Sequence, residues 1–246
     1  MIFIGYANDD RYSIVESLVF HLKNWGFHIW YDFHNMYLGD DRIKVNFEYG
    51  IRESSYVIFV ISHNTFKSRC AIDELLYARD LQESGNIVLF PILYELTADD
   101  LPREYLWLKK IIYNETTKAS GTFYVVNQII EKVLSDYQNF LDMKTFSLTI
   151  RDLNKIDPYL DSLINTLDKI DLDNYNARMG ILYAAYLYIY NTIKQIPELP
   201  LFCTKAIERI FALTRLNISI DHLTYGIYQD IITIDLKYFI NTKNIN

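Results

Sequence analysis

The feature that most constrains the fold of this chain is an alternation of short apolar runs with helical patterns over its first 142 residues. The runs are rich in Ile, Val, Phe and Tyr, and the segments between them place apolar residues about one helical turn apart. This alternation is typical of βαβ units and predicts an α/β fold with a mostly parallel, doubly wound sheet. Five strands are expected, over residues 2–7, 27–32, 55–62, 86–94 and 109–114.

The individual runs predict where each element lies in this sheet. "SYVIFVIS" (55–62) is apolar without interruption, which favours a central strand buried on both faces. Pro91 is expected near the end of the fourth strand because proline cannot donate to a ladder. Gly26 is expected to stop the first helix. Helices are predicted over 12–26, 68–80 and 122–141.

From about residue 145 onward the pattern is helical only. Asp157 is a candidate helix cap, with Pro158 at the first helical position. The change predicts two parts, an α/β domain over 1–142 and a smaller all-α accessory or oligomerisation region over 145–246. Further helices are expected near 174–195, 201–216 and 219–241.

Composition excludes several classes of function. The chain carries 31 acidic and 24 basic residues, for a formal charge of −7. This charge disfavours a nucleic-acid partner and an anionic membrane surface. Cys70 and Cys203 form no metal-ligand spacing, which suits a reduced compartment. No run is long and apolar enough to span a bilayer, and the N-terminus lacks signal-peptide character, so we expect a cytoplasmic protein.

Several motifs of common enzyme classes are absent from the sequence. It contains no GxGxxG, no GKS or GKT phosphate loop, no HExxH and no GxSxG, which disfavours a dehydrogenase, an NTPase and an α/β-hydrolase. Ligands of open α/β sheets bind at the carboxyl ends of the strands. The helix over 68–80 starts just after the third strand, so its acids are candidate site residues.

Asp73 and Glu74 are expected in the first turn of that helix, where a carboxylate has two interpretations. An acid near a helix N-terminus is favourable by about 0.3–1 kcal/mol through the helix dipole alone. The alternative is that Glu74 performs chemistry. The segment taken alone favours the helix-dipole interpretation of Glu74. The rest of the chain favours the interpretation that Glu74 performs chemistry.

Three segments, in order, resemble the TIR (Toll/interleukin-1 receptor) domain over about residues 1–140. The first is the aromatic strand "FIGY" (3–6) followed by acids, and the second is "WYD" (30–32) followed by a loop with Gly39. The third is "ISHNTFKSRCAIDEL" (61–75), in which Ser68 and Glu74 keep the family's six-residue spacing. Each fragment alone is weak evidence for the family, but their order and spacing together are specific to it. The resemblance implies a flavodoxin-like doubly wound sheet of five parallel strands.

Two positions depart from the family pattern. Cys70 stands where the family has a tryptophan that often packs on a nucleotide ring, and Tyr37 or Phe66 is a candidate replacement. Gly5 stands where serine is usual, which is consistent with a close backbone approach.

The enzymatic branch of the TIR family cleaves NAD+, and the resemblance implies that Glu74 is the catalytic residue. No metal or cofactor is implied, since NAD+ is the substrate. The bacterial members of anti-phage systems resemble this chain in joining a TIR domain to an accessory region, and some release a nucleotide signal for a downstream effector. The substrate-binding candidates are Tyr6, Ala7, Asp32, Tyr37, Phe66, Ser68 and Cys70.

The resemblance also implies a homo-oligomer, formed through TIR–TIR contacts at the loop 33–42 and through the helical region. The residues leave the product open between ADP-ribose and a cyclic ADP-ribose isomer. They also leave two alternatives open: a non-enzymatic TIR scaffold, and an enzyme resembling nucleoside deoxyribosyltransferases, which share a similar sheet and a catalytic glutamate.

Overall fold

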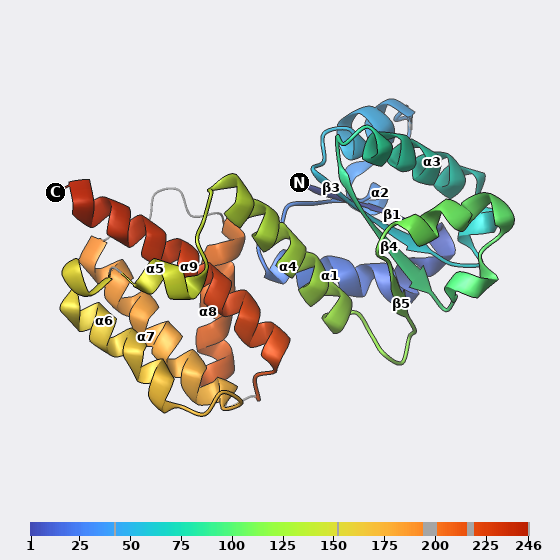
Figure 1. Ribbon diagram of the computed structural model, residues 1–246. Coiled ribbons are helices and arrows are strands. Elements are labelled where there is room, and N and C mark those ends of the chain that lie inside the picture. The colour runs from blue at the N-terminus through green and yellow to red at the C-terminus, as the bar shows by residue number, and fades with distance from the viewer. Residues whose placement is uncertain (42, 152, 194–200, 216–218, 246) are drawn as a thin grey trace. The chain divides into compact units, whose positions relative to one another are not determined.

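The computed structural model describes residues 1–41, 43–151, 153–193, 201–215 and 219–245 (Figure 1). The chain forms two compact units, Met1–Val126 and Asn127–Asn246. The first unit is α/β and the second is helical, as the sequence pattern predicts. The division between the compact units lies within helix α4 (Phe123–Phe140), and the domain bounds 1–142 and 145–246 stay a prediction.

The first unit contains a parallel sheet of five strands in the order β2-β1-β3-β4-β5, which confirms the predicted fold class. The strand β3 lies at the centre, and five of its six residues are buried, so it packs on both faces. The strands are β1 (Ile2–Gly5), β2 (Ile29–Trp30), β3 (Tyr56–Ile61), β4 (Val88–Tyr94) and β5 (Asn114–Thr116).

Helices cover both faces of this sheet (Figure 1). Alternate residues of a strand point to opposite faces, and the odd-numbered residues of β1 and β3 join the core beneath helix α3 (Arg69–Glu83). Helix α1 (Glu16–Asn24) lies on the opposite face, where Leu18 and Leu22 are fully buried. A π-helical turn, Arg11–Val15, leads into α1, and the chain leaves α1 through Gly26 at φ +84°.

The fifth strand lies later in the chain than predicted. Residues 109 and 110 end a 3-10 helix, Arg103–Lys110, whose Tyr105 and Leu108 are buried three positions apart. The strand itself is the polar segment Asn114–Thr116, which pairs with Ile92–Tyr94. An edge strand is specified by its backbone pairing more than by apolar residues. The apolar run within 109–114 therefore placed the predicted strand too early in the chain.

Pro91 lies inside β4 rather than near its end, which corrects a second expectation. It is aligned with Phe59 of β3, and the ladder to β5 starts only at Ile92. No strand among the described residues pairs with β4 at Pro91 on the β5 side, so that side loses no ladder hydrogen bond to proline.

Two helical segments follow β2, where no secondary structure is predicted from sequence. A short helix, α2, covers Asp32–Asn35, and a π-helical segment covers Ile43–Ile51. The second segment is tied to β2 by Gly50, where a Cβ atom would lie 2.7 Å from the Trp30 indole nitrogen. Only glycine lets this segment approach the tryptophan so closely.

The second unit consists of helices, and its candidate cap is confirmed: Asp157 accepts from the Leu160 amide at 3.0 Å, with Pro158 in the first turn of α6. Three further predicted helices are present, although residues 194, 195 and 216 of these predictions lie outside the described residues. None of the described helices has the length and hydropathy needed to cross a membrane. The helices are α5 (Phe146–Ile150), α6 (Pro158–Ile164), α7 (Tyr175–Ile193), α8 (Leu201–Arg215) and α9 (His222–Ile245).

Candidate active site

The candidate site lies at the carboxyl ends of β1 and β3, where the strand order of the sheet reverses. In the strand order β2-β1-β3-β4-β5, β2 follows β1 on one side of the sheet, and β3, β4 and β5 extend to the other side. The order therefore reverses between β1 and β3, and a doubly wound sheet binds ligands at the carboxyl ends of two such neighbouring strands. Tyr6 and Ala7 follow β1 directly, and Ser62 follows β3. All three are buried.

Seven residues separate the end of β3 from helix α3, whose first residue is Arg69. Ser68 is the N-cap, and its hydroxyl oxygen accepts a hydrogen bond from the Ala71 amide at 3.3 Å. Asp73 and Glu74 therefore lie in the second turn, and the prediction that they occupy the first turn is wrong. The helix dipole acts mainly on the first turn, which weakens the purely electrostatic interpretation of Glu74.

Glu74 is a buried carboxylate, with 6% of its surface exposed. Its Oε1 accepts a hydrogen bond from Nδ2 of Asn46 at 2.7 Å. Asn46 is itself buried and lies on the π-helical segment that follows β2. A carboxylate of this kind is costly to bury, so its retention calls for a specific role.

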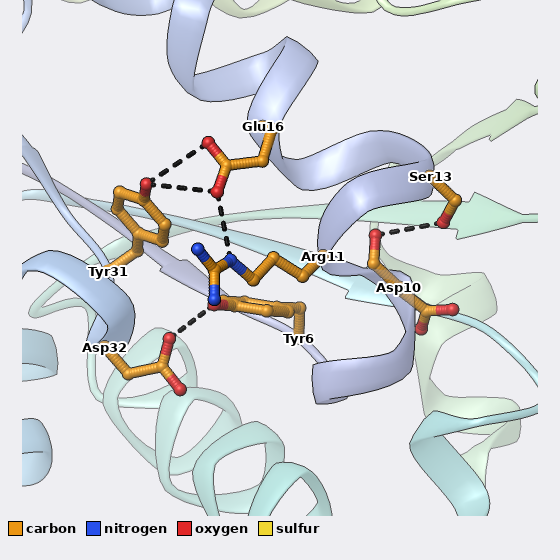
Figure 2. Close-up of polar contacts among 7 residues, drawn as sticks. All are labelled: Tyr6, Asp10, Arg11, Ser13, Glu16, Tyr31 and Asp32. Atoms are coloured by element: carbon orange, nitrogen blue, oxygen red, sulfur yellow. Dashed lines mark hydrogen bonds and ion pairs between the residues drawn. The ribbon is translucent and has the colours of Figure 1, made fainter.

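A second polar contact joins two predicted site residues that follow the neighbouring strands β1 and β2. The Tyr6 hydroxyl donates a hydrogen bond to Oδ1 of Asp32 (Figure 2). Burial, and then the hydrogen bond to Asp32, raise the pKa of Tyr6 well above its usual value. Tyr6 is therefore a neutral hydroxyl donor at any physiological pH, and it fixes the Asp32 side chain beside the carboxyl end of β1.

Tyr31 lies next to this pair and belongs to a separate network (Figure 2). Its hydroxyl lies 3.4 Å from a carboxylate oxygen of Glu16, and that carboxylate forms an ion pair with Arg11 at 3.0 Å. Burial, followed by the Glu16 charge, raises the pKa of Tyr31 to about 12. The network joins the start of α1 to the end of β2.

Asp10 forms a third buried network that shapes the chain after β3. Its carboxylate accepts from the Ser62 hydroxyl at 2.5 Å and from Asn64 Nδ2 at 2.8 Å. The Ser62 amide donates to the Thr65 hydroxyl at 3.0 Å. These bonds hold the turn between β3 and α3, and therefore set where α3 begins.

Comparison with known proteins decides what this domain is. Residues 2–122 match the family model described as the TIR domain. This region is a TIR domain. The match covers the sheet, the three networks and Glu74, and it excludes the helical unit that follows.

The curated relatives of the TIR domain include NAD+-processing proteins of bacteria and archaea. The chain is 33% identical over 103 residues to the 2' cyclic ADP-D-ribose synthase BtTIR of Bacteroides thetaiotaomicron, covering 41% of this chain and 35% of that protein. It is 29% identical over 133 residues to the NAD(+) hydrolase TcpA of a Theionarchaea archaeon, covering 52% and 38%. The matched region thus spans less than half the length of these relatives.

A solved structure is also similar to the TIR domain. The crystal structure of the TIR domain of the Toll-related receptor TRR-2 from Hydra magnipapillata aligns with 24% identity and a TM-score of 0.38. The alignment covers 46% of this chain and 82% of that chain.

The structure places the remaining predicted site residues of the TIR domain in different surroundings. Ala7 is buried, and its carbonyl accepts from the Asp10 amide at 2.8 Å. The Phe66 ring packs against Tyr105, with ring centroids 4.9 Å apart, so this ring belongs to the apolar core beneath α3. Cys70 is exposed on α3, and Tyr37 is exposed on the loop 33–42, of which residue 42 is not described.

Gly5 has a packing explanation within the TIR domain. A Cβ atom at this position would lie 2.3 Å from a ring carbon of Phe59, on the neighbouring strand β3. A side chain at this position would require the Phe59 ring to shift. Gly5 and Phe59 therefore form a matched pair within the core.

Sequence reasoning missed the polar partners that hold the candidate site. Asn46 is the main one, and its signal is an amide between the apolar residues Val45 and Phe47 in "IKVNFEYGI" (43–51). Glu16 and Arg11 are the others, and no spacing marks them. Among the described residues no group of three or more His, Cys, Asp or Glu side chains is arranged to hold a metal ion.

Proposed function

We propose that this TIR domain cleaves the bond between nicotinamide and ribose in NAD+, with Glu74 as the catalytic residue. One observation carries the proposal: a TIR domain holds a buried glutamate on the helix that follows the central strand, at the ligand-binding edge of the sheet. The names of the relatives, which are NAD+ hydrolases and cyclic ADP-ribose synthases, support this choice of substrate.

The chemistry requires only one well-placed carboxylate. Nicotinamide in NAD+ carries a positive charge and leaves as a neutral molecule, so no general acid is needed to protonate it. As the C–N bond lengthens, positive charge develops on the ribose ring, as in glycoside cleavage. A carboxylate near the ribose stabilises this charge more in the transition state than in the substrate, and therefore lowers the barrier.

The acceptor of the ribosyl group determines the product. Attack by water gives ADP-ribose, whereas attack by an adenine nitrogen or a ribose hydroxyl of the same molecule gives a cyclic isomer. Because names of both kinds occur among the relatives, both products belong to the proposal. Tyr6 and Asp32, joined by a hydrogen bond beside the end of β1, are proposed to contact the substrate.

The experiment compares Glu74→Gln with Asp73→Asn, the same chemical change at the adjacent exposed position of α3. The full chain is incubated with NAD+, and nicotinamide and the ADP-ribose products are separated by chromatography. Glu74→Gln should lower turnover by about 10²–10³-fold with a retained melting temperature, because it removes one electrostatic stabiliser of the transition state. Asp73→Asn should retain wild-type turnover.

The same assay separates the competing functions. Wild-type protein that is folded and releases no nicotinamide over a wide concentration range contradicts the proposal and favours a scaffold. Transfer from deoxynucleosides without cleavage of NAD+ favours the deoxyribosyltransferase alternative. Turnover of Glu74→Gln equal to that of the wild type refutes the role of Glu74.

Assembly into a homo-oligomer belongs to the same proposal. Tyr37 and Leu38 have exposed large side chains on the loop 33–42. Both lie in a turn that is closed by a hydrogen bond from the Tyr37 amide to the Asp40 carboxylate at 2.7 Å. This loop is proposed to contact a second TIR domain, with the helical unit organising the copies. We also propose that the activity serves anti-phage signalling through a nucleotide product. This role is tested by phage plating on bacteria that express the wild type or Glu74→Gln.

A further inference from the structure

We infer that Asn46 is a positioning residue for Glu74 and that Trp30 sets the orientation of the Asn46 amide. The inference rests on the proposed function, because it concerns how the catalytic carboxylate is held. It is carried by a chain of contacts from β2, through the π-helical segment, to α3.

The first contact fixes the carboxylate. Asn46 Nδ2 lies 2.7 Å from Glu74 Oε1, a normal distance for a hydrogen bond to a charged acceptor, and both side chains are buried. A glutamate carboxylate rotates about its last carbon–carbon bond, and a hydrogen bond to one oxygen stops this rotation. The direction of the other oxygen is then fixed as well.

The second contact determines which end of the amide faces Glu74. Trp30 Nε1 lies 3.4 Å from Asn46 Oδ1, and an indole nitrogen can only donate. The amide oxygen must therefore face Trp30, which leaves the amide nitrogen facing the carboxylate. A primary amide serves both neighbours at once, because it has an acceptor and a donor on one planar group.

The third contact holds Trp30 in place. Gly50 lies one turn beyond Asn46 on the same segment, and a Cβ atom there would lie 2.7 Å from Trp30 Nε1 and 2.9 Å from the Phe3 ring. The indole ring is therefore packed tightly against the segment that carries Asn46. Contacts thus run from Trp30 on β2, through Asn46 on the π-helical segment, to one carboxylate oxygen of Glu74 on α3.

Catalysis depends on this geometry because a displacement of about 1 Å at a reacting group can cost about 100-fold in rate. Asn46 does not need to touch the substrate to matter. Its loss should lower kcat while the affinity for NAD+ changes little, since most of the substrate is bound by other groups.

The main test is Asn46→Asp, which keeps the size of the side chain and replaces the donor with a second carboxylate. The assay is nicotinamide release from NAD+ by the full chain, with melting temperatures measured for every variant. We expect kcat to fall by about 10–100-fold and KM to change less than threefold. Asn165→Asp makes the same change beside Asp161 in the helical unit, where the amide donates at 3.0 Å, and should retain wild-type kcat.

A double-mutant cycle distinguishes positioning from general damage. In the Glu74→Gln background, Asn46→Asp should change the residual rate by less than twofold, because there is no carboxylate left to position. A structural defect would lower the rate by the same factor in both backgrounds. If Asn46→Asp does not fold, Trp30→Phe replaces it and should lower kcat by about threefold or more with KM retained.

Three results overturn the inference while leaving the proposed function intact. The first is an unchanged kcat in the folded Asn46→Asp or Trp30→Phe variant, and the second is a raised KM with an unchanged kcat. The third is a loss of rate on Asn46→Asp that is as large in the Glu74→Gln background as in the wild type. Wild-type protein without nicotinamide release overturns the proposed function itself. The two failures are therefore distinguishable.

Discussion

The helical unit buries one carboxylic acid without a hydrogen bond, and this predicts an unusual dependence of its stability on pH. Asp235 on α9 has no exposed surface, and neither of its side-chain oxygens has a hydrogen-bond partner among the residues that the structure describes. Burial raises the pKa of Asp235 well above its usual value. The acid is therefore protonated in the folded state at pH values where it is ionised in the unfolded chain.

The sign of the effect follows from proton linkage. Between the usual pKa of about 3.9 and the raised pKa of the folded state, the folded protein binds one more proton than the unfolded chain. The free energy of unfolding therefore falls as the pH rises, by up to about 1.4 kcal/mol per pH unit from this one group. The contribution is fully present below the usual pKa and is lost as the pH rises towards the pKa of the folded state.

Asp235→Asn removes the ionisation and keeps the shape of the side chain. The variant and the wild type should be most similar in stability near pH 4, where Asp235 is neutral in the folded protein and only about half ionised in the unfolded chain. Above that pH the variant should become progressively more stable than the wild type. The difference in their free energies of unfolding should grow by up to about 1.4 kcal/mol per pH unit. Asp230 and Glu131 in the same unit also have raised pKa values through burial, but they contribute equally to both proteins.

The assay is urea unfolding of the full chain at pH 4, 5, 6 and 7, followed by far-UV circular dichroism and tryptophan fluorescence. All three tryptophans, Trp25, Trp30 and Trp107, lie in the first unit, so fluorescence follows that unit and circular dichroism follows both. Asp168→Asn, at an exposed position of the helical unit, is the control. Parallel stability curves for the wild type and Asp235→Asn would refute the reasoning.

Substitutions at two further positions test the packing of β1 against β3 and the start of α3. Gly5→Ala places a Cβ atom against the Phe59 ring and should lower the free energy of unfolding by about 1–3 kcal/mol in thermal or urea melts; an unchanged melting temperature would contradict the close contact. Ser68→Ala removes the N-cap of α3 and should cost about 1 kcal/mol, whereas Ser68→Asp should retain the stability. Equal losses in both Ser68 variants would contradict the capping role.

The alternation of apolar runs was enough to predict the sheet because burial on both faces requires continuous apolar strands. The segment over 55–62 is such a run, and it forms the buried central strand β3. The Asp157 cap was also predictable, because capping is a local interaction between a side chain and the next turn. The edge strand Asn114–Thr116 was not, since backbone pairing with β4 specifies it and its side chains are polar.

The sequence by itself determined the α/β class, the position of the helical region and the identity of Glu74 as a candidate, because these depend on periodicity and on spacing along the chain. Only the tertiary structure decided what holds Glu74. Asn46 lies 28 residues from Glu74 and 16 from Trp30 in the sequence, and no local pattern links them. They meet because the strand order places β2, β1 and β3 side by side, so side chains from separate crossovers converge at one edge of the sheet.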